Sequence, residues 1–169
     1  MKIVLIGFMG TGKTTVAPIL AAKLRLEVVE MDDLIVAKAG GKSIAGIFES
    51  GGEAEFRKLE IAISQDLGNR DNLVISTGGG VVTSEIAMDY LTREATVVEL
   101  NASFETVIKR IDPKTPRPLF QNQTQAQVLY EERKPLYSSY AAIHVVTDGK
   151  SIEEVAEETF TQINKMESL

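Results

Sequence analysis

Short apolar stretches alternate along the chain with longer segments in which apolar residues recur at helical spacing. The apolar stretches are rich in β-branched residues and cover residues 3–6, 28–29, 73–76, 96–100 and 143–146. The helical segments cover residues 13–24, 33–39, 43–67, 84–91, 103–110, 126–141 and 152–165. Short apolar stretches separated by helices are typical of a parallel sheet buried on both faces. The pattern predicts a doubly wound α/β fold, whose ligands bind at the carboxyl ends of the strands.

The first apolar stretch leads directly into Gly-Phe-Met-Gly-Thr-Gly-Lys-Thr at residues 7–14. Its three glycines let the backbone turn with positive φ and approach an anion without a Cβ in the way. The unpaired N–H groups at the start of the next helix point toward the same place. An ordinary glycine-rich turn would not require Lys13 and Thr14 after the last glycine. We therefore predict a phosphate-binding P-loop, in which Lys13 bridges the β- and γ-phosphates and Thr14 offers its hydroxyl to Mg²⁺. The nucleotide-binding residues are then Gly10, Thr11, Gly12, Lys13, Thr14 and Thr15.

The acidic residues that follow the second apolar stretch, in Glu30-Met31-Asp32-Asp33, allow two interpretations. Carboxylates at this sheet edge can hold Mg²⁺ or accept a proton from an attacking hydroxyl. They can equally cap the following helix and interact with its dipole. Spacing alone does not separate these readings. Asp33 is the better cap, which leaves Asp32 and Glu30 available for chemistry.

Gly78, Gly79 and Gly80 end the third apolar stretch, and a triple glycine at the ligand-bearing edge suggests that a substrate contacts bare backbone there. The polar segment 112–125 contains three of the five prolines and Arg117. A loop of this length in a small domain is usually either functional or disordered, and a mobile lid is its functional form. By default, Arg57 would be a solvated helix charge.

Two prolines are expected to disturb helices. Pro18 lies inside the first helix, which it should kink or loosen. Pro135 is expected to end the helix that contains Arg133, in which case Arg133 could be only a partner of the helix dipole.

Composition narrows the possible classes of protein. With 169 residues, 44% of them hydrophobic, the chain is long enough for one core and too short for two ordinary domains. A net charge of −6 argues against a nucleic-acid or membrane-surface binder. No cysteine is present, and no apolar run approaches the length of a membrane span. A cytoplasmic protein fits these features best.

Read in order, the motifs resemble those of the shikimate kinases. These motifs are the P-loop, the carboxylates, Phe56-Arg57 behind Gly52-Glu53, the triple glycine, Arg117-Pro118-Leu119 and Glu132-Arg133-Lys134-Pro135-Leu136-Tyr137. The resemblance runs from residue 1 to about residue 148. It implies a single three-layer P-loop domain with a five-stranded parallel sheet of order 2-3-1-4-5. A helical substrate-binding subdomain at about 32–61 and a mobile lid at about 112–125 would complete this domain.

The resemblance also implies a reaction. A shikimate kinase transfers the γ-phosphate of ATP to the 3-hydroxyl of shikimate, giving shikimate 3-phosphate and ADP, in aromatic amino acid biosynthesis. One Mg²⁺ per subunit would assist, and the enzyme is expected to be a cytoplasmic monomer that binds small molecules, with no nucleic-acid or membrane partner. The nearest rivals are another small P-loop kinase, such as a gluconate or nucleoside-monophosphate kinase, and a nucleotide-binding switch without an acceptor pocket.

Several residues gain roles by this resemblance. Asp32 matches the carboxylate that contacts the reacting hydroxyl, Arg57 and Arg133 match the pair that grips the substrate carboxylate, and Gly78, Gly79 and Gly80 match a backbone cradle. Lys13, Asp32 and Arg117 would be catalytic, with Arg117 as the lid arginine facing the transferring phosphate.

Other matches concern the nucleotide and the metal. Arg110 matches the residue that packs against adenine, and Ser76 matches a group near Mg²⁺ and its waters. Glu30 stands where the family usually has aspartate and would reach the metal through water. Aligning Asp32 with the base requires one extra residue in Gly40-Gly41-Lys42, so Asp33 remains an alternative base.

Overall fold

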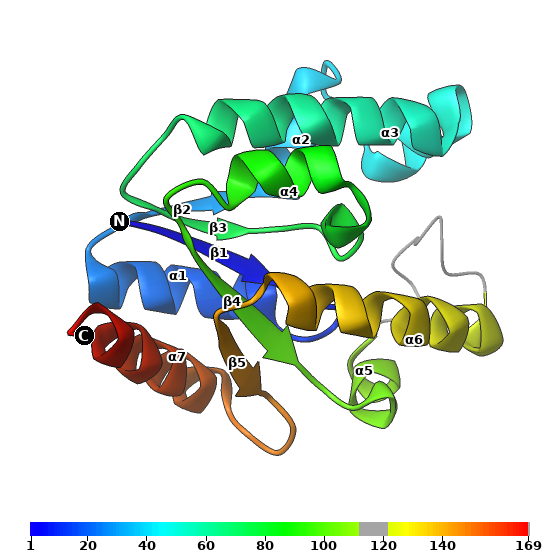
Figure 1. Ribbon diagram of the computed structural model, residues 1–169. Coiled ribbons are helices and arrows are strands. Elements are labelled where there is room, and N and C mark those ends of the chain that lie inside the picture. Colours follow the sequence, from blue (N-terminus) through cyan, green and yellow to red (C-terminus); the bar gives the residue numbers. More distant parts are fainter. Residues whose placement is uncertain (112–121, 169) are drawn as a thin grey trace.

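The computed structural model describes residues 1–111 and 122–168, which form three layers around a parallel sheet (Figure 1). The strands are β1 (Lys2–Ile6), β2 (Glu27–Glu30), β3 (Leu73–Ser76), β4 (Thr96–Asn101) and β5 (Ile143–Val146). The helices are α1 (Lys13–Leu24), α2 (Met31–Lys38), α3 (Ile44–Gly68), α4 (Glu85–Leu91), α5 (Phe104–Arg110), α6 (Gln123–Tyr140) and α7 (Ile152–Glu167), with a 3₁₀ turn η1 (Val81–Thr83). The strand order is β2-β3-β1-β4-β5, and every pair is parallel. Both the α/β class and the expected sheet order are therefore confirmed.

The central strand β1 supplies side chains to two separate cores. Ile3 and Leu5 pack on one face with apolar residues of α1 and α7, whereas Val4 and Ile6 pack on the other face with α3, α4 and α6. Figure 1 shows α1 and α7 on one side of the sheet and α3 and α4 on the opposite side. These four apolar side chains of β1 are fully buried, as the continuous apolar run predicts for a covered parallel strand.

The carboxyl ends of the strands meet at one edge of the sheet. β1 runs into the P-loop, β2 into α2, and β3 into the triple glycine. In this register Ser76 lies opposite both Leu5 and Glu30, so three functional segments begin side by side.

Two of the described helices contain a proline. α1 spans Lys13–Leu24, as the pattern predicts, with Pro18 inside it. The prediction that Pro135 ends a helix was wrong, because α6 continues to Tyr140, close to the end of the helical pattern at 126–141, with Tyr137 buried beyond the proline. The missing N–H of a proline removes one helical hydrogen bond, and burial of the flanking helix face outweighs that loss here.

The start of α2 also corrects a prediction. Asp33 is not the cap, because Glu30 occupies that position and Asp32 and Asp33 both lie in the first turn. The predicted lid overlaps α6, which begins at Gln123 behind the capping residue Asn122. Arg117 and the rest of that predicted segment lie outside the described residues. Among the described residues, no helix is long and apolar enough to cross a membrane.

Candidate active site

The P-loop glycines adopt the conformations that the motif requires. Gly7, Gly10 and Gly12 have φ values of 147°, 77° and 99°. A Cβ on Gly7 would lie 2.3 Å from the carbonyl oxygen of Leu100, so no other residue fits there without a shift of the backbone. The loop can approach the end of β4 this closely because Gly7 has no side chain.

Side chains of the P-loop also donate hydrogen bonds to its own backbone carbonyl groups. The Lys13 Nζ donates to the carbonyl oxygens of Gly7 at 2.7 Å and Phe8 at 2.9 Å. Thr11 is buried and donates its hydroxyl to Phe8 at 2.8 Å, while Thr15 donates to Gly12 at 3.0 Å. Lys13 is thus fixed over the loop, where its ammonium group can meet a polyphosphate.

The triple glycine lies beside two guanidinium groups and a carboxylate. A Cβ on Gly80 would lie 2.5 Å from Nη2 of Arg57 and 3.2 Å from Nη2 of Arg133. A Cβ on Gly78 would lie 3.3 Å from Oδ1 of Asp32. Gly80 has a φ of −97°, which any residue can adopt, so a side chain there would act by displacing the Arg57 guanidinium and not by straining the backbone. Guanidinium groups from α3 and α6 therefore meet at Gly80, and a carboxylate from α2 lies at Gly78.

Asp32 and Asp33 are separated by the geometry of α2. Asp32 is partly buried and faces Gly78, whereas Asp33 is exposed to solvent. The two aspartates are adjacent in one helical turn, so their side chains point about 100° apart. The arrangement favours Asp32 as the carboxylate that an acceptor would meet.

Sequence reasoning missed Glu60, which organises Arg57. Glu60 is 1% exposed, and Arg57 Nη1 donates to its Oε1 at 2.6 Å. Burial raises the pKa of the Glu60 carboxyl, and the paired Arg57 lowers it in part. Arg57 is therefore not a solvated charge, because a buried carboxylate holds its guanidinium toward Gly80. The available signal was the spacing of three residues on one helix, which places Arg57 and Glu60 on the same face.

Oxygen atoms gather where β2 and β3 end beside α1. Burial raises the pKa of the Glu30 carboxyl, while the hydroxyls of Ser76 and Thr14 beside it lower that pKa in part. The Ser76 Oγ is fully buried and lacks a hydrogen-bond partner of normal geometry within the described residues. A buried hydroxyl beside a carboxylate, together with an exposed threonine, forms a donor set that suits a hard divalent cation with its water shell.

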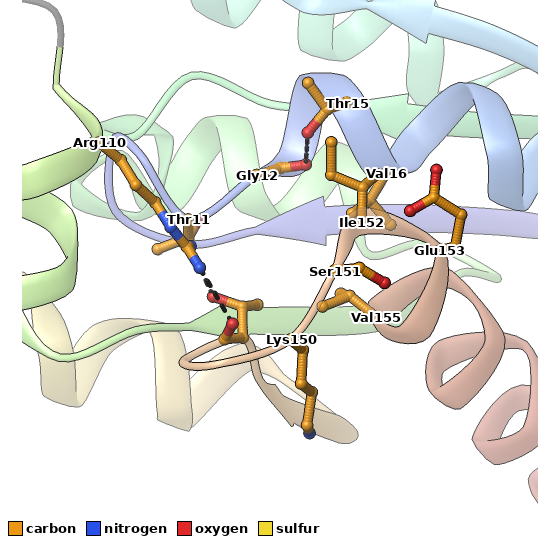
Figure 2. A pocket seen from close by; sticks show the side chains of 11 residues that line it. Thr11, Gly12, Thr15, Val16, Arg110, Lys150, Ser151, Ile152, Glu153 and Val155 are labelled. Atoms are coloured by element: carbon orange, nitrogen blue, oxygen red, sulfur yellow. Dashed lines mark hydrogen bonds between the residues drawn. The ribbon is translucent and has the colours of Figure 1, made fainter.

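A pocket of about 430 Å³ lies beside the P-loop, between it and the segment that follows β5 (Figure 2). Its lining residues include Thr11, Gly12 and Arg110 and the segment 150–153 that follows β5. Figure 2 shows Arg110 reaching from α5 toward the β5–α7 loop, where it donates to the hydroxyl of Thr147 at 2.9 Å and to the Thr147 carbonyl at 3.0 Å. The residues 150–153 were not predicted, although they follow the carboxyl end of the fifth strand.

Comparison with known proteins gives a consistent result. The Shikimate kinase family model matches residues 9–164. A shikimate kinase of Sulfurihydrogenibium sp. (strain YO3AOP1) is 40% identical over 165 residues, which are 97% of this chain and 98% of the relative. The structure of shikimate kinase from Acinetobacter baumannii in complex with shikimate has a TM-score of 0.92 at 33% identity, covering 97% of this chain and 93% of that one. Shikimate kinase from Aquifex aeolicus vf5 gives a TM-score of 0.83 at 36% identity, with 98% and 97% covered. The chain belongs to the shikimate kinase family.

Proposed function

We propose that this member of the shikimate kinase family, an ATP-dependent kinase of shikimate, transfers the γ-phosphate to the 3-hydroxyl at the sheet edge where the P-loop and the triple glycine meet. The observation that carries the proposal is the position of Gly80 between Arg57 and Arg133. Two planar guanidinium groups beside bare backbone suit a carboxylate, which each can bind through two parallel hydrogen bonds. This pair explains how a chain of net charge −6 selects an anionic acceptor.

Asp32 is the proposed general base. It lies at Gly78, two residues before the glycine where the two arginines meet, so an acceptor held by its carboxylate at Gly80 would extend toward Asp32 with its ring hydroxyls. The carboxylate orients the reacting hydroxyl and takes its proton as the new bond to phosphorus forms.

Charge on the transferring phosphoryl group is neutralised by cations. Lys13 is held over the loop for this task, and Arg117, in the proposed lid at about 112–125, would face the transferring phosphate. Mg²⁺, when bound with the nucleotide, neutralises charge on the β- and γ-phosphates. Thr14 would hold the metal directly, and Glu30 and Ser76 would hold it through water. The lid excludes water and so suppresses hydrolysis of ATP.

The remaining assignments concern the nucleotide and the organisation of the chain. Arg110 packs against adenine in the pocket beside Thr11 and Gly12, where its contacts with Thr147 support it. Residues at about 32–61 form the acceptor-binding part of a single domain, and the enzyme works as a cytoplasmic monomer.

Adjacent asparagine substitutions test the proposed base. Asp32→Asn keeps the size and hydrogen bonding of the side chain but removes the proton acceptor, so kcat should fall by roughly 10²–10⁴. Asp33→Asn is the matched control, because it removes the same charge from an exposed position in the same turn and should leave kcat close to that of the wild type. Steady-state kinetics with melting temperatures for both variants decide the matter. An inactive Asp33→Asn beside an active Asp32→Asn would move the base to Asp33.

A further inference from the structure

Helix α6 carries two buried tyrosines on one face, and each donates its hydroxyl to a backbone carbonyl that follows a strand. Tyr130 donates to the carbonyl of Ala102 at 2.8 Å, after β4. Tyr137 donates to the carbonyl of Gly79, after β3. Seven residues are nearly two helical turns, so both side chains face the sheet edge. They differ in what surrounds the hydroxyl.

The Tyr137 hydroxyl lies where the acceptor site meets the P-loop. The backbone of Gly79 is packed so closely on the P-loop that a Cβ there would lie 3.2 Å from the amide nitrogen of Met9. Arg133, one turn earlier on α6, is also buried, and its Nη2 would lie 3.2 Å from a Cβ on the next glycine, Gly80. Burial raises the pKa of the Tyr137 hydroxyl, and the neighbouring Arg133 lowers it in part, so the group keeps its proton near neutral pH.

The donor capacity of the hydroxyl is used by the Gly79 carbonyl, which receives its single proton. Its lone pairs remain available to the buried guanidinium of Arg133, one helical turn earlier. A flexible arginine that is held in its binding orientation beforehand loses less freedom when it binds an anion.

We propose that Tyr137, anchored on the Gly79 carbonyl, is a positioning residue for the acceptor that holds the Arg133 guanidinium in place. The proposal rests on the function of Arg133 given above. Tyr137 acts on the acceptor through Arg133.

The matched test compares Tyr137→Phe with Tyr130→Phe. Both substitutions keep the ring and remove one buried hydroxyl that donates to a backbone carbonyl. Each should lower the melting temperature by a similar amount, about 2–4 °C. Only Tyr137→Phe should raise the KM for shikimate, by about tenfold, because a contact with a charged group is lost. The KM for ATP should stay within about twofold in both variants.

Double substitutions show whether the effect passes through Arg133. In an Arg133→Lys background, Tyr137→Phe should change the KM for shikimate by less than about twofold, because its partner is already altered. In an Arg57→Lys background, the tenfold effect should persist, since Arg57 is held by Glu60 instead. A full effect in the Arg133→Lys background would overturn the proposal.

Failure of this proposal is distinguishable from failure of the proposed function. Equal KM values for shikimate in the two tyrosine variants, with normal turnover by the wild type, would overturn only the role of Tyr137. Loss of all shikimate-dependent turnover in the wild type would overturn the proposed function and this inference together.

Discussion

Glycine serves two different purposes at this site, and they were not equally visible in the sequence. In the P-loop it permits positive φ, which follows from the motif itself because the motif describes a local backbone shape. At Gly80 it leaves room for two guanidinium groups. Those groups come from α3 and α6, so the residues alone indicated bare backbone but not what lies against it. Only the resemblance paired Arg57 with Arg133.

Glu30 gives a prediction about pH and metal. Because burial raises its pKa in the folded protein, the folded state binds a proton more tightly than the unfolded state does. The ionised Glu30 carboxylate therefore destabilises the folded state at pH values above its raised pKa. This destabilisation disappears as the pH falls below the pKa of an ordinary glutamate. Glu30→Gln should raise the melting temperature of the ligand-free protein at pH 7, and the difference should vanish on acidification.

Metal dependence provides the second half of that test. If Glu30 assists Mg²⁺ through water, Glu30→Gln should also need more Mg²⁺ for half-maximal activity. Glu27→Gln, on the same strand, is the control, since Glu27 is exposed and paired with Arg70 at 2.9 Å. Thermal melts across pH and Mg²⁺ titrations of activity measure both effects. Identical behaviour of the two variants would remove Glu30 from the metal site.

At the scale of elements, the alternation of apolar stretches and helical segments predicted every strand and nearly every helix. It did not correctly predict where a helix is interrupted. Pro135 was expected to end a helix that in fact continues, because packing of the flanking residues decides the outcome. Gly52, in contrast, breaks α3 with a φ of 71° and a ψ of −173°. Nothing in the local pattern distinguished that break from a tolerated helical glycine.

The break at Gly52 is predicted to set the direction of the helix segment that carries Arg57. Its conformation is essentially restricted to glycine, and no atom lies near enough to obstruct a Cβ. Gly52→Ala should therefore destabilise the protein by about 1–3 kcal/mol through backbone strain alone. It should also raise the KM for shikimate, because the segment with Arg57 and Glu60 must shift.

Gly40→Ala is the comparison for this prediction. Gly40 also has a positive φ, 72°, with open space around it, but it precedes α3. It should lower the melting temperature without changing the KM for shikimate. If Gly52→Ala and Gly40→Ala behave alike in kinetics, the break has no role in placing Arg57.

At the scale of the whole molecule, the parallel sheet explains why residues distant in sequence share one site. All strands end at the same edge, so the P-loop, Asp32 and the triple glycine converge without long connections. The sequence pattern was sufficient to predict this edge and the phosphate end of the site. It could not predict Glu60 or Tyr137, because their roles depend on which helix faces meet over the edge.

The central claim is that phosphate leaves ATP only when shikimate accepts it. A coupled assay of ADP release by the wild type, with shikimate, with gluconate and with no acceptor, tests it most directly. Lys13→Met serves as the background control, because it removes the charge that the P-loop holds for the phosphates. The account predicts that the wild type releases ADP from ATP in an Mg²⁺-dependent manner with shikimate, but not with gluconate or without an acceptor. Lys13→Met should release no ADP under any of these conditions. ADP release that is independent of shikimate, or equally fast with gluconate, would contradict it.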